Sequence, residues 1–285
     1  MNRLIAAIIL VLGSFGAANA GEQEVLDAAL RFYEGGDYHA AITEALRYQC
    51  LYPAGTSFAR SVLLMGKAYY RGDNYRAALG VLLSCGRMYP GSPEGEEALY
   101  LAAYIQLEKG EPPEAALTRA EYRKLYPAGR FLEEAARDEC FSAALSQDMR
   151  GSGDGIRAYR AAYPQGKYLS DLEGLERTVH DDASRPRRYL WLSVLGSALF
   201  PGFGQFYTGH YATGFLTLFS NALFIFMICN GAMMRDTFQI VFFSLAEAVV
   251  YQYNIMSSVR VVEEYNGARQ REFFRSVRLG LTSSF

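Results

Sequence analysis

The segment Val62–Pro90, VLLMGKAYYRGDNYRAALGVLLSCGRMYP, contains the signals that decide the fold. Two stretches of helix length flank Gly72-Asp73, and the second stretch ends at Tyr89-Pro90. Glycine tolerates the left-handed conformation that ends a helix, and an acidic residue beside it can cap the next helix. Proline lacks an amide N–H and disfavours helical angles in the residue before it. The segment therefore predicts a helical hairpin.

The same signals recur along the chain with a period of 37 residues. A Tyr-Pro pair, followed within two residues by glycine, occurs at Tyr52-Pro53, Tyr89-Pro90, Tyr126-Pro127 and Tyr163-Pro164. About half a period upstream, glycine followed by an acidic residue occurs at Gly36-Asp37, Gly72-Asp73, Gly110-Glu111 and, displaced, Gly153-Asp154. One hairpin cannot bury its apolar face alone, so hairpins of this kind stack. The pattern predicts an all-α solenoid of about four helical hairpins over residues 21–170, with a shortened second helix in the fourth hairpin.

The second hairpin resembles a tetratricopeptide repeat. Its small, tyrosine, alanine and proline residues match that family's spacing at Val62, Met65, Gly66, Tyr69, Tyr75, Ala78, Leu82 and Pro90. The third hairpin departs from the pattern at Pro112 and Arg119. The 37-residue period with Tyr-Pro ends resembles the periplasmic branch found in barrel-assembly lipoproteins and Tol-Pal-associated proteins. The resemblance covers roughly residues 22–170 and implies the fold more strongly than a particular function.

Tetratricopeptide superhelices present a concave face lined by the first helix of each pair. By this resemblance, the candidate partner-groove residues are Arg60, Lys67, Tyr70, Tyr100, Tyr104 and Gln106. Tyrosines with adaptable polar neighbours suit a groove for an extended peptide or a partner helix. It remains open at this point whether these side chains only pack between helices or face solvent.

Residues 1–20 have the pattern of a secretory signal peptide. Arg3 supplies the positive charge, Leu4–Leu12 the apolar stretch and Ala18-Asn19-Ala20 the small-residue cleavage site. The apolar stretch is shorter than the ~20 residues of a membrane span. An uncleaved amino-terminal anchor is the open alternative. Because no cysteine follows the apolar stretch, we expect no diacyl lipid anchor, and we expect the repeats in a bacterial periplasm.

The last third of the chain becomes apolar after a charged linker at residues 171–188. Tyr189–Met234 contains 46 residues without one Asp, Glu, Lys or Arg, and Thr237–Val259 contains a single acid. Since a span needs ~20 apolar residues, residues 189–259 predict a short bundle of two to three transmembrane helices. Residues 260–285 are predicted to form a basic tail.

Two topologies of this module remain open. Three crossings carry the tail and its five arginines to the cytoplasm, in keeping with the positive-inside bias. If the segment around Pro201-Gly202 enters the membrane and turns back, two crossings remain and the tail returns to the periplasm. In either case the bacterial inner membrane is the predicted location.

The first apolar stretch also contains a glycine-rich motif. Its residues Pro201, Gly202, Gly204, Gln205, Tyr207 and Gly209 resemble the signature of transmembrane-two-type helical hairpin domains. The resemblance implies a membrane module and carries no chemistry. Glycines at this spacing allow close helix packing, and we expect Gln205 and Tyr207 to satisfy backbone groups freed by Pro201.

Glu247 lies inside the last apolar stretch. An intramembrane carboxyl is a functional-site hypothesis by default. It could carry protons, or it could pair with Gln205, Asn221, Asn230 or His210. Structural pairing is the preferred interpretation.

The composition argues against several classes of protein. Residues 21–182 carry 25 acidic side chains against 18 lysines and arginines, which leaves no basic face for nucleic acid. The four cysteines form no C-x-x-C pair, so we expect neither a zinc site nor a disulfide framework. A single Cys50–Cys85 disulfide remains open beside the simpler interpretation that the cysteines pack between helices.

No catalytic constellation is recognisable in the sequence. The three histidines, His39, His180 and His210, are unrelated in spacing, and the chain contains no phosphate-binding loop or nucleophile elbow. The pairs Glu96-Glu97 and Glu133-Glu134 are expected on solvated helix faces. We therefore expect no enzyme activity, no cofactor, no metal and no small-molecule substrate.

Together these features predict a membrane-anchored periplasmic scaffold or adaptor. Its repeat domain would bind a protein partner of the cell envelope, and its apolar helices would hold it in the lipid bilayer. The alternative is a small membrane transport or proton-coupled subunit in which Glu247 functions and the repeats recruit a partner.

Overall fold

The computed structural model describes residues 21–282, so the predicted signal peptide at residues 1–20 lies outside the described residues. All regular secondary structure in residues 21–282 is helical, which confirms the all-α fold class. The chain divides into two compact units. The first, here called the repeat unit, comprises residues 21–176 together with 277–282, and the second, the hairpin unit, comprises Arg177–Ser276.

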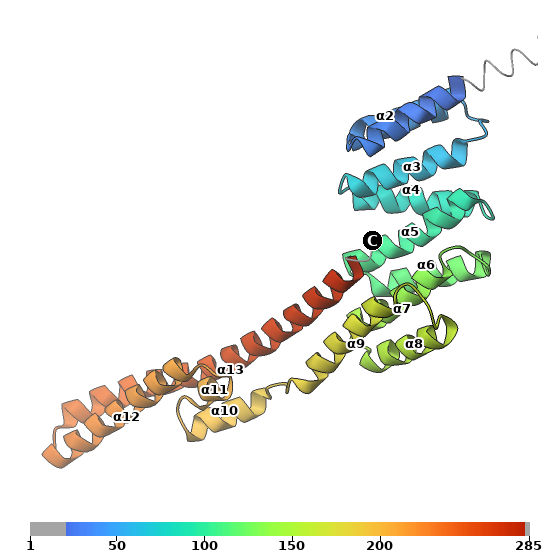
Figure 1. Cartoon of the computed structure of the whole chain (residues 1–285). Helices are drawn as coiled ribbons and strands as arrows, with labels where there is room; N and C mark the ends of the chain where they lie inside the picture. Colours follow the sequence, from blue (N-terminus) through green and yellow to red (C-terminus); the bar gives the residue numbers. More distant parts are fainter. Residues whose placement is uncertain (1–20, 283–285) are drawn as a thin grey trace, which may run out of the picture. The chain divides into compact units, whose positions relative to one another are not determined.

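The repeat unit is a series of helical hairpins (Figure 1). Residues 21–34 form its first helix. The following helices are α2 (Tyr38–Leu51), α3 (Phe58–Arg71), α4 (Tyr75–Met88), α5 (Pro93–Lys109), α6 (Pro112–Leu125), α7 (Leu132–Leu145), α8 (Met149–Ala162) and the start of α9 (Leu169–Ser184). Besides the pairing of consecutive helices, α3 contacts α5 and α5 contacts α7. The first helices of successive hairpins therefore share one face.

The Tyr-Pro and glycine-acid signals predicted from the sequence explain most of the helix boundaries. Each Tyr-Pro tyrosine is the C-cap of the second helix of its hairpin, at Tyr52, Tyr89, Tyr126 and Tyr163. At the other boundary, the Asp37 carboxylate accepts a hydrogen bond from the Ala40 backbone N–H at 3.0 Å and caps α2. In the next hairpin Asp73 instead takes a positive φ of 59°, and the side chain of Asn74 caps α4.

The fourth hairpin differs from its sequence-based prediction. Gly153 and Asp154 lie within α8, and the turn before this helix is made by Gln147, with φ 60°, and Asp148, whose carboxylate caps the helix. The helix has 14 residues, as do α2, α4 and α6, so it is not shortened. The prediction was wrong because a glycine-acid pair was given more weight than the Asp148 cap.

Small residues let the paired helices approach closely. A Cβ added at Gly66 in α3 would lie 2.6 Å from Leu82 Cδ2 in α4. Ala29 and Ala103, one 37-residue period before and after Gly66, are 0% and 1% exposed. Of the cysteines, Cys85 and Cys140 are buried and Cys50 and Cys229 are exposed, and all four are free thiols. The considered Cys50–Cys85 disulfide is therefore not formed, and the interpretation as packing residues holds for Cys85 and Cys140 only.

The hairpin unit begins with the end of α9 and continues with α10 (Leu190–Leu199), α11 (Phe203–Tyr207), α12 (Tyr211–Met234) and most of α13 (Thr237–Thr282). Pro201 and Gly202, the latter with φ 90°, separate α10 from α11. Neither of these helices has the ~20 residues that a span needs. In α13 the helix runs 46 residues without a break, so the expected boundary between a span and a separate tail at residue 260 is not a structural one.

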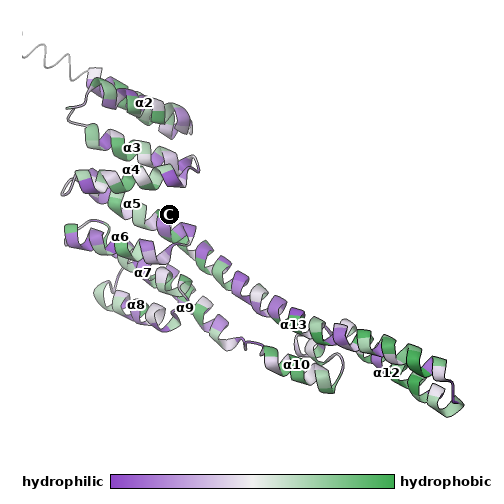
Figure 2. Ribbon diagram, turned by 180° about the vertical axis from the view of Figure 1, so that it is seen from behind, coloured by the Kyte–Doolittle hydropathy of each residue, from purple (hydrophilic) through white to green (hydrophobic). Residues whose placement is uncertain are grey.

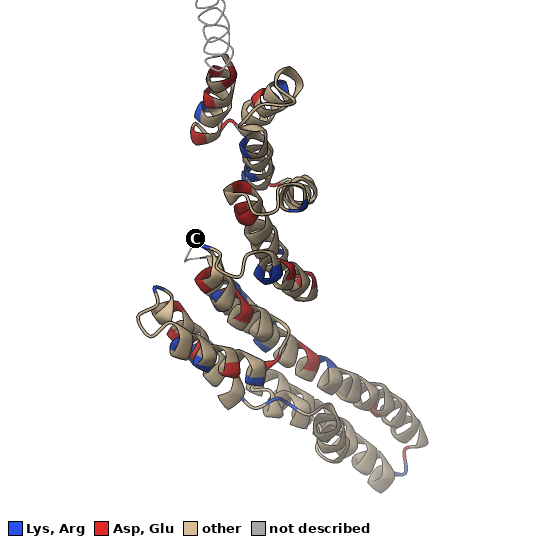
Figure 3. Ribbon diagram, turned by 90° about the vertical axis from the view of Figure 1, so that its right-hand side faces the viewer, with Lys and Arg blue, Asp and Glu red and all other residues tan. Residues whose placement is uncertain are grey.

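Two helices of the described chain, α12 and α13, are long and apolar enough to cross a membrane. In their most apolar 18-residue windows only 11% and 6% of the residues are buried, whereas the core helix of a water-soluble protein would be mostly buried. Figure 2 shows hydrophobic residues covering α12 and the part of α13 beside it. Figure 3 shows the same stretches nearly free of charge.

Candidate protein-binding groove

The first helices of the hairpins enclose a pocket of about 200 Å³. Its lining residues come from four successive hairpins and are mostly aromatic or charged: Tyr33, Lys67, Tyr70, Arg71, Glu97, Tyr100, Leu101 and Phe131. On α3 and on α5 the lining residues follow i, i+3, i+4 spacing, which places each group of three on one helix face. The pocket therefore lies on the face that the tetratricopeptide resemblance predicts for a partner.

Charged and aromatic groups meet across this pocket. The Lys67 ammonium forms an ion pair with the Glu97 carboxylate. The Tyr70 hydroxyl donates a hydrogen bond to Glu108 Oε2 at 2.8 Å, and burial, reinforced by this carboxylate, raises the pKa of Tyr70. A hydrogen bond with Tyr33 raises the pKa of the Arg71 guanidinium. The lining side chains are thus held by contacts within the face itself.

Tyr100 supplies an unused donor at the pocket. Its ring stacks on Phe131 with centroids 4.7 Å apart and an interplanar angle of 2°. Only 4% of the residue is exposed, and its hydroxyl oxygen has no hydrogen-bond partner within residues 21–282. A buried hydroxyl without a partner costs free energy, which a ligand acceptor can recover.

The structure brings together three of the six predicted groove residues, Lys67, Tyr70 and Tyr100. Arg60 is exposed on α3 and does not line this pocket. Tyr104 and Gln106 are buried, with 1% and 8% exposure, and the Gln106 side chain accepts a hydrogen bond from Thr118 on α6 at 2.7 Å. These two predictions need correction, because both side chains pack inside the unit and neither lines the pocket.

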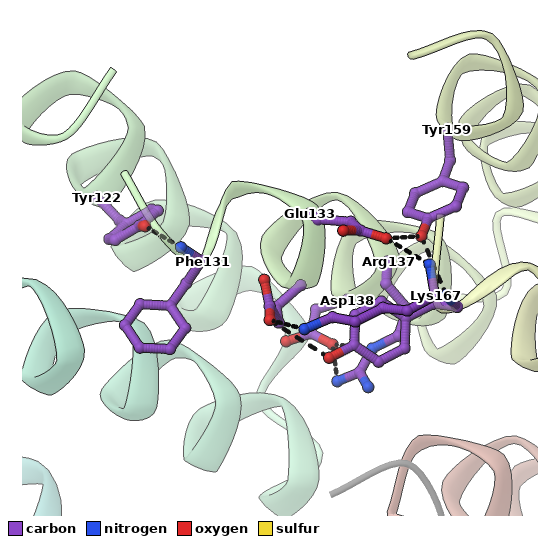
Figure 4. A network of polar contacts seen from close by, with 9 residues as sticks. Tyr122, Phe131, Glu133, Arg137, Asp138, Tyr159 and Lys167 are labelled. Atoms are coloured by element: carbon purple, nitrogen blue, oxygen red, sulfur yellow. Dashed lines mark hydrogen bonds and ion pairs between the residues drawn. The ribbon is translucent and has the colours of Figure 1, made fainter. Parts of the chain in front are cut away.

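A repeating tyrosine–carboxylate contact, missed in the sequence, holds the hairpins together. The hydroxyls of Tyr122 and Tyr159 donate to the carboxylates of Glu96 and Glu133, at 3.0 and 2.7 Å, and Tyr48 donates likewise to Glu22. Each hydroxyl also accepts the backbone N–H nine residues ahead, from Ser57, Phe131 and Tyr168. Figure 4 shows the contact between Tyr122 and Phe131. Each contact therefore ties the second helix of one hairpin to its first helix and to the next loop.

These contacts also explain the glycine of the Tyr-Pro-x-Gly signal. A Cβ at Gly129 would lie 2.4 Å from Tyr122 Oη and 2.7 Å from Glu96 Oε1. Gly55 and Gly166 face the equivalent pairs. The glycine is thus required by the close approach of the loop to the hydrogen bond. The recurrence of glutamate at positions 22, 96 and 133 was the sequence signal for it.

The second hairpin lacks this contact. Ala59 and Cys85 occupy the positions of the glutamate and the tyrosine. The Cys85 thiol lies 3.8 Å from the Ala59 carbonyl oxygen, and burial raises the pKa of this thiol to about 12. A neutral thiol therefore fills the site of a tyrosine–carboxylate pair.

The expectation of solvated carboxylates was wrong for Glu96 and Glu134, which are 7% and 9% exposed. A further buried carboxylate in α7 belongs to Asp138. Arg137 donates from Nε and Nη2 to Asp138 Oδ1 at 2.8 and 2.6 Å (Figure 4), and both residues are at most 1% exposed. The Arg137 guanidinium lies 4.5 Å from the centroid of the Tyr168 ring. Burial raises the pKa of Asp138, and the adjacent Arg137 opposes this effect. An ion pair, rather than a solvated surface, lies inside this part of the unit.

The end of α13 belongs to the repeat unit. Val277 and Leu281 are 1% and 0% exposed. A Cβ at Gly280 would lie 3.2 Å from the Phe141 ring of α7, and one at Gly110 would lie 2.6 Å from Arg278 Nη2. These residues were predicted to form part of a separate basic tail. The structure instead buries the apolar side of this segment within the repeat unit.

The glycine-rich motif of the hairpin unit serves helix packing. A Cβ at Gly204 would lie 2.5 Å from Ser193 Oγ, and one at Gly202 would lie 2.4 Å from the Gly214 carbonyl oxygen. Gly209 has a φ of 86° in the turn before α12, and Pro201 lies in the break before α11. The close packing expected of these glycines is therefore present.

At the break between α10 and α11, backbone groups form hydrogen bonds with a side chain that the sequence analysis did not single out. Asn254 of α13 accepts from the Gly202 N–H at 3.0 Å and donates to the Ser197 carbonyl at 2.9 Å. Gln205 instead donates to Ser257 Oγ at 3.0 Å, and Tyr207 accepts from the Tyr189 N–H at 3.2 Å. The predicted role of Gln205 and Tyr207 is therefore corrected.

Glu247 does not make the pairing preferred from the sequence. It lies in the apolar part of α13, partly buried, and its Oε2 atom has no hydrogen-bond partner among the described residues. Asn221, on the neighbouring α12, donates to the Thr217 carbonyl at 2.7 Å, and its own side-chain oxygen is also without a partner in that range. Across residues 21–282, no group of three or more His, Cys, Asp or Glu side chains is placed to hold a metal ion.

Comparison with protein families gives a match over most of the repeat unit. The family YfiO, described as outer membrane lipoprotein, matches residues 19–175. The chain belongs to this family. The match ends where the hairpin unit begins, and it supports a protein-binding scaffold in general terms. A comparison with curated proteins gives no match.

Proposed function

We propose that this chain is a membrane-anchored scaffold of the bacterial cell envelope. Its repeat unit lies in the periplasm and binds a segment of a protein partner, and α12 and α13 anchor it in the inner membrane. The observation that carries the proposal is the aromatic and charged pocket on the shared face of the first helices. Membership of the YfiO family supports the envelope location.

The pocket suits a peptide or helix that presents an apolar side chain beside polar groups. Phe131 and the tyrosine rings offer apolar area with little loss of side-chain entropy, and such residues dominate binding at protein interfaces. The unpaired Tyr100 hydroxyl can donate to a partner carbonyl. Lys67 and Glu97 already neutralise each other, so shape and hydrogen bonding, rather than net charge, would select the partner.

The anchor we propose is a two-crossing hairpin. The helices α12 and α13 are joined by a turn at Arg235-Asp236, so both free ends of the hairpin lie on one side of the membrane. Burial of Val277 and Leu281 in the repeat unit supports a carboxyl end on the same side as the repeats. The apolar helical spans favour the inner membrane over the outer, whose spanning proteins use alternating strands.

Photo-crosslinking in intact cells tests the groove. A photoreactive amino acid at Lys67 should give a discrete adduct with one partner protein, whereas the same group at Lys124, exposed on α6, should give none. Tyr100→Phe should weaken the Lys67 adduct without unfolding the chain. Equal crosslinking from both lysine positions, or no adduct at either, would contradict a partner groove on this face.

Glu247 supports a second candidate function. A partly buried carboxyl whose Oε2 has no described partner, within an apolar helix, is the feature expected of a proton-coupled membrane subunit. Glu247→Gln distinguishes the two candidates. Loss of the cellular phenotype with normal membrane insertion would favour this second function, and a silent substitution would favour the scaffold.

A further inference from the structure

A second pocket, of about 530 Å³, lies within the hairpin unit. It is formed between Arg185, which follows α9, His210 at the N-cap of α12, and the polar part of α13 from Glu264 to Glu272. None of its lining residues belongs to the repeat unit. The pocket therefore belongs to the hairpin unit alone.

The position of this pocket along the helices corresponds to the edge of a membrane. His210 immediately precedes the apolar helix α12, and the lining residues of α13 follow its apolar part. Three aromatic rings of the same unit, Tyr189, Trp191 and Tyr211, are 60–63% exposed. Tyrosine and tryptophan concentrate at the headgroup level of membranes, so the pocket would lie at that level.

Arginines dominate the polar groups at the pocket. Arg269 binds Asp182 with two hydrogen bonds to the carboxylate, at 2.9 and 2.8 Å, and its third nitrogen, Nη1, is buried without a partner in the described chain. Arg185 pairs with Glu272 at 2.8 Å. Arg271 lines the pocket and makes no ion pair with any described residue.

The guanidinium of Arg188 is held in place beside the pocket. Its backbone exchanges two hydrogen bonds with the Asn266 side chain, at 3.1 and 2.9 Å. Its guanidinium lies 4.6 Å from the ring centroid of Tyr207 and 5.4 Å from that of Tyr265, which lines the pocket. Its Nε is also buried and unpartnered within residues 21–282. Two guanidinium groups are thus held in place, each with one N–H that is buried and has no acceptor among the described residues.

We propose that this pocket binds the phosphate headgroup of an anionic phospholipid. Phosphate oxygens are the acceptors that guanidinium donors fit best, and basic pockets at the ends of membrane helices bind such headgroups. The exposed apolar surface of α12, which begins beside His210, is placed to receive the acyl chains. Glu264 and Glu272 also line the pocket, which favours the single negative charge of a phosphodiester over the greater charge of inorganic phosphate.

This inference rests on the proposed membrane insertion, and Trp191 allows the two to be tested separately. Trp191 is the single tryptophan of the chain and belongs to the same unit. The full chain is reconstituted in phosphatidylcholine vesicles that contain a minor share of phosphatidylglycerol, with the bromine quencher on either lipid. Quenching of Trp191 by brominated phosphatidylcholine reports insertion. If brominated phosphatidylglycerol quenches more strongly than its share of the lipid predicts, the excess reports the site.

Arg271→Gln should reduce the preference for phosphatidylglycerol about fivefold, since one arginine near an anionic surface contributes about that factor. The matched control is Arg275→Gln, an exposed arginine one turn further along α13 that does not line the pocket, and it should leave the preference unchanged. Equal quenching by both lipids, equal effects of the two variants, or full displacement by inorganic phosphate would each overturn the lipid site while leaving the anchor intact. Absence of quenching by either lipid would overturn the anchor and the site together.

Discussion

The two units of this chain have opposite interiors. In the repeat unit the buried side chains are mostly apolar, and the buried charges are held by partners such as Arg137–Asp138. In the hairpin unit the most buried side chains are small and neutral polar groups, including Ser193, Ser197 and Asn254, while large apolar side chains are exposed. In water, apolar groups are driven into the interior. In lipid, polar groups must find their hydrogen-bond partners inside the protein. The repeat unit thus has the interior expected in water, and the hairpin unit has the interior that the proposed membrane insertion requires.

The same difference shows what holds each unit together. The repeats combine apolar packing with tyrosine–carboxylate contacts that join the two helices of a hairpin. The hairpin unit relies on close approach at glycines and on hydrogen bonds to backbone groups, such as those of Asn254. Small residues and neutral polar bonds are the usual means of packing helices where no hydrophobic drive exists between them.

The largest effect is expected at the buried ion pair of the repeat unit. Asp138→Ala leaves the Arg137 guanidinium buried without its counter-charge, which should lower the free energy of unfolding by about 3–5 kcal/mol. Asp154→Ala removes an exposed ion pair with Arg157 and should cost at most about 1 kcal/mol. Urea unfolding of the full chain in detergent measures both. Equal losses would mean that Asp138 is not in a dry interior.

The exposed faces of the two units should respond differently to charge. Phe226→Arg in α12 should oppose membrane insertion by about 3 kcal/mol and move the chain toward the carbonate-soluble fraction. Leu117→Arg, on the exposed surface of α6, should change stability by no more than about 0.5 kcal/mol and leave fractionation unaltered. If Phe226→Arg were as silent as Leu117→Arg, the apolar face of α12 would not contact lipid.

Removing a tyrosine hydroxyl that makes the tyrosine–carboxylate contact should lower stability, whereas removing the hydroxyl of a neighbouring tyrosine without that contact should not. Tyr122→Phe removes the donor to Glu96 and the acceptor for the Phe131 N–H, so we expect a loss of about 1–3 kcal/mol. Tyr163→Phe is the control, since no hydrogen bond of its hydroxyl exists among the described residues. Thermal unfolding compares the two variants, and a similar melting temperature for both would remove the proposed role of the contact.

The smallest effect is expected in the pH dependence of the first hairpin. The hydrogen bond from Tyr48 lowers the pKa of Glu22, so the pair stabilises the fold above the ordinary carboxyl value of 4.5 and loses this contribution as pH falls below it. Burial, together with Glu22, raises the pKa of Tyr48 to about 12 from 10.0, so stability is lost as pH rises through that range. Melting temperatures measured across pH should show both losses, and Tyr48→Phe should reduce the alkaline one without abolishing it, since burial also raises the pKa values of Tyr122 and Tyr159.

Periodicity made the repeat architecture predictable. Tyr-Pro ends and the Asp37 cap follow from local backbone chemistry, so they were visible in the sequence. The buried positions of Glu96 and Asp138 were not, because a carboxylate on a helix faces solvent unless a distant partner such as Tyr122 or Arg137 is brought to it. Only three of the six predicted groove residues line the pocket, for the same reason. Burial of Tyr104 and Gln106 depends on the side chains that pack against them.

In the hairpin unit, length and hydropathy identified α12 and the apolar part of α13. They did not show that α10 and α11 are short helices on either side of a break, or that α13 continues to Thr282. The basic stretch at the end favoured a cytoplasmic tail by the positive-inside bias. In the structure Arg269 binds Asp182, and Val277 and Leu281 pack into the repeat unit.

Cysteine labelling of the full chain tests the anchored-scaffold account most directly. In a background where the exposed Cys50 and Cys229 are replaced by serine, single cysteines are placed at Asp236, in the turn between α12 and α13, and at Thr282. A maleimide that crosses the permeabilised outer membrane but not the inner membrane should label Thr282→Cys and leave Asp236→Cys unlabelled. Labelling of both positions, or of Asp236→Cys alone, would contradict a two-crossing anchor with the repeats in the periplasm.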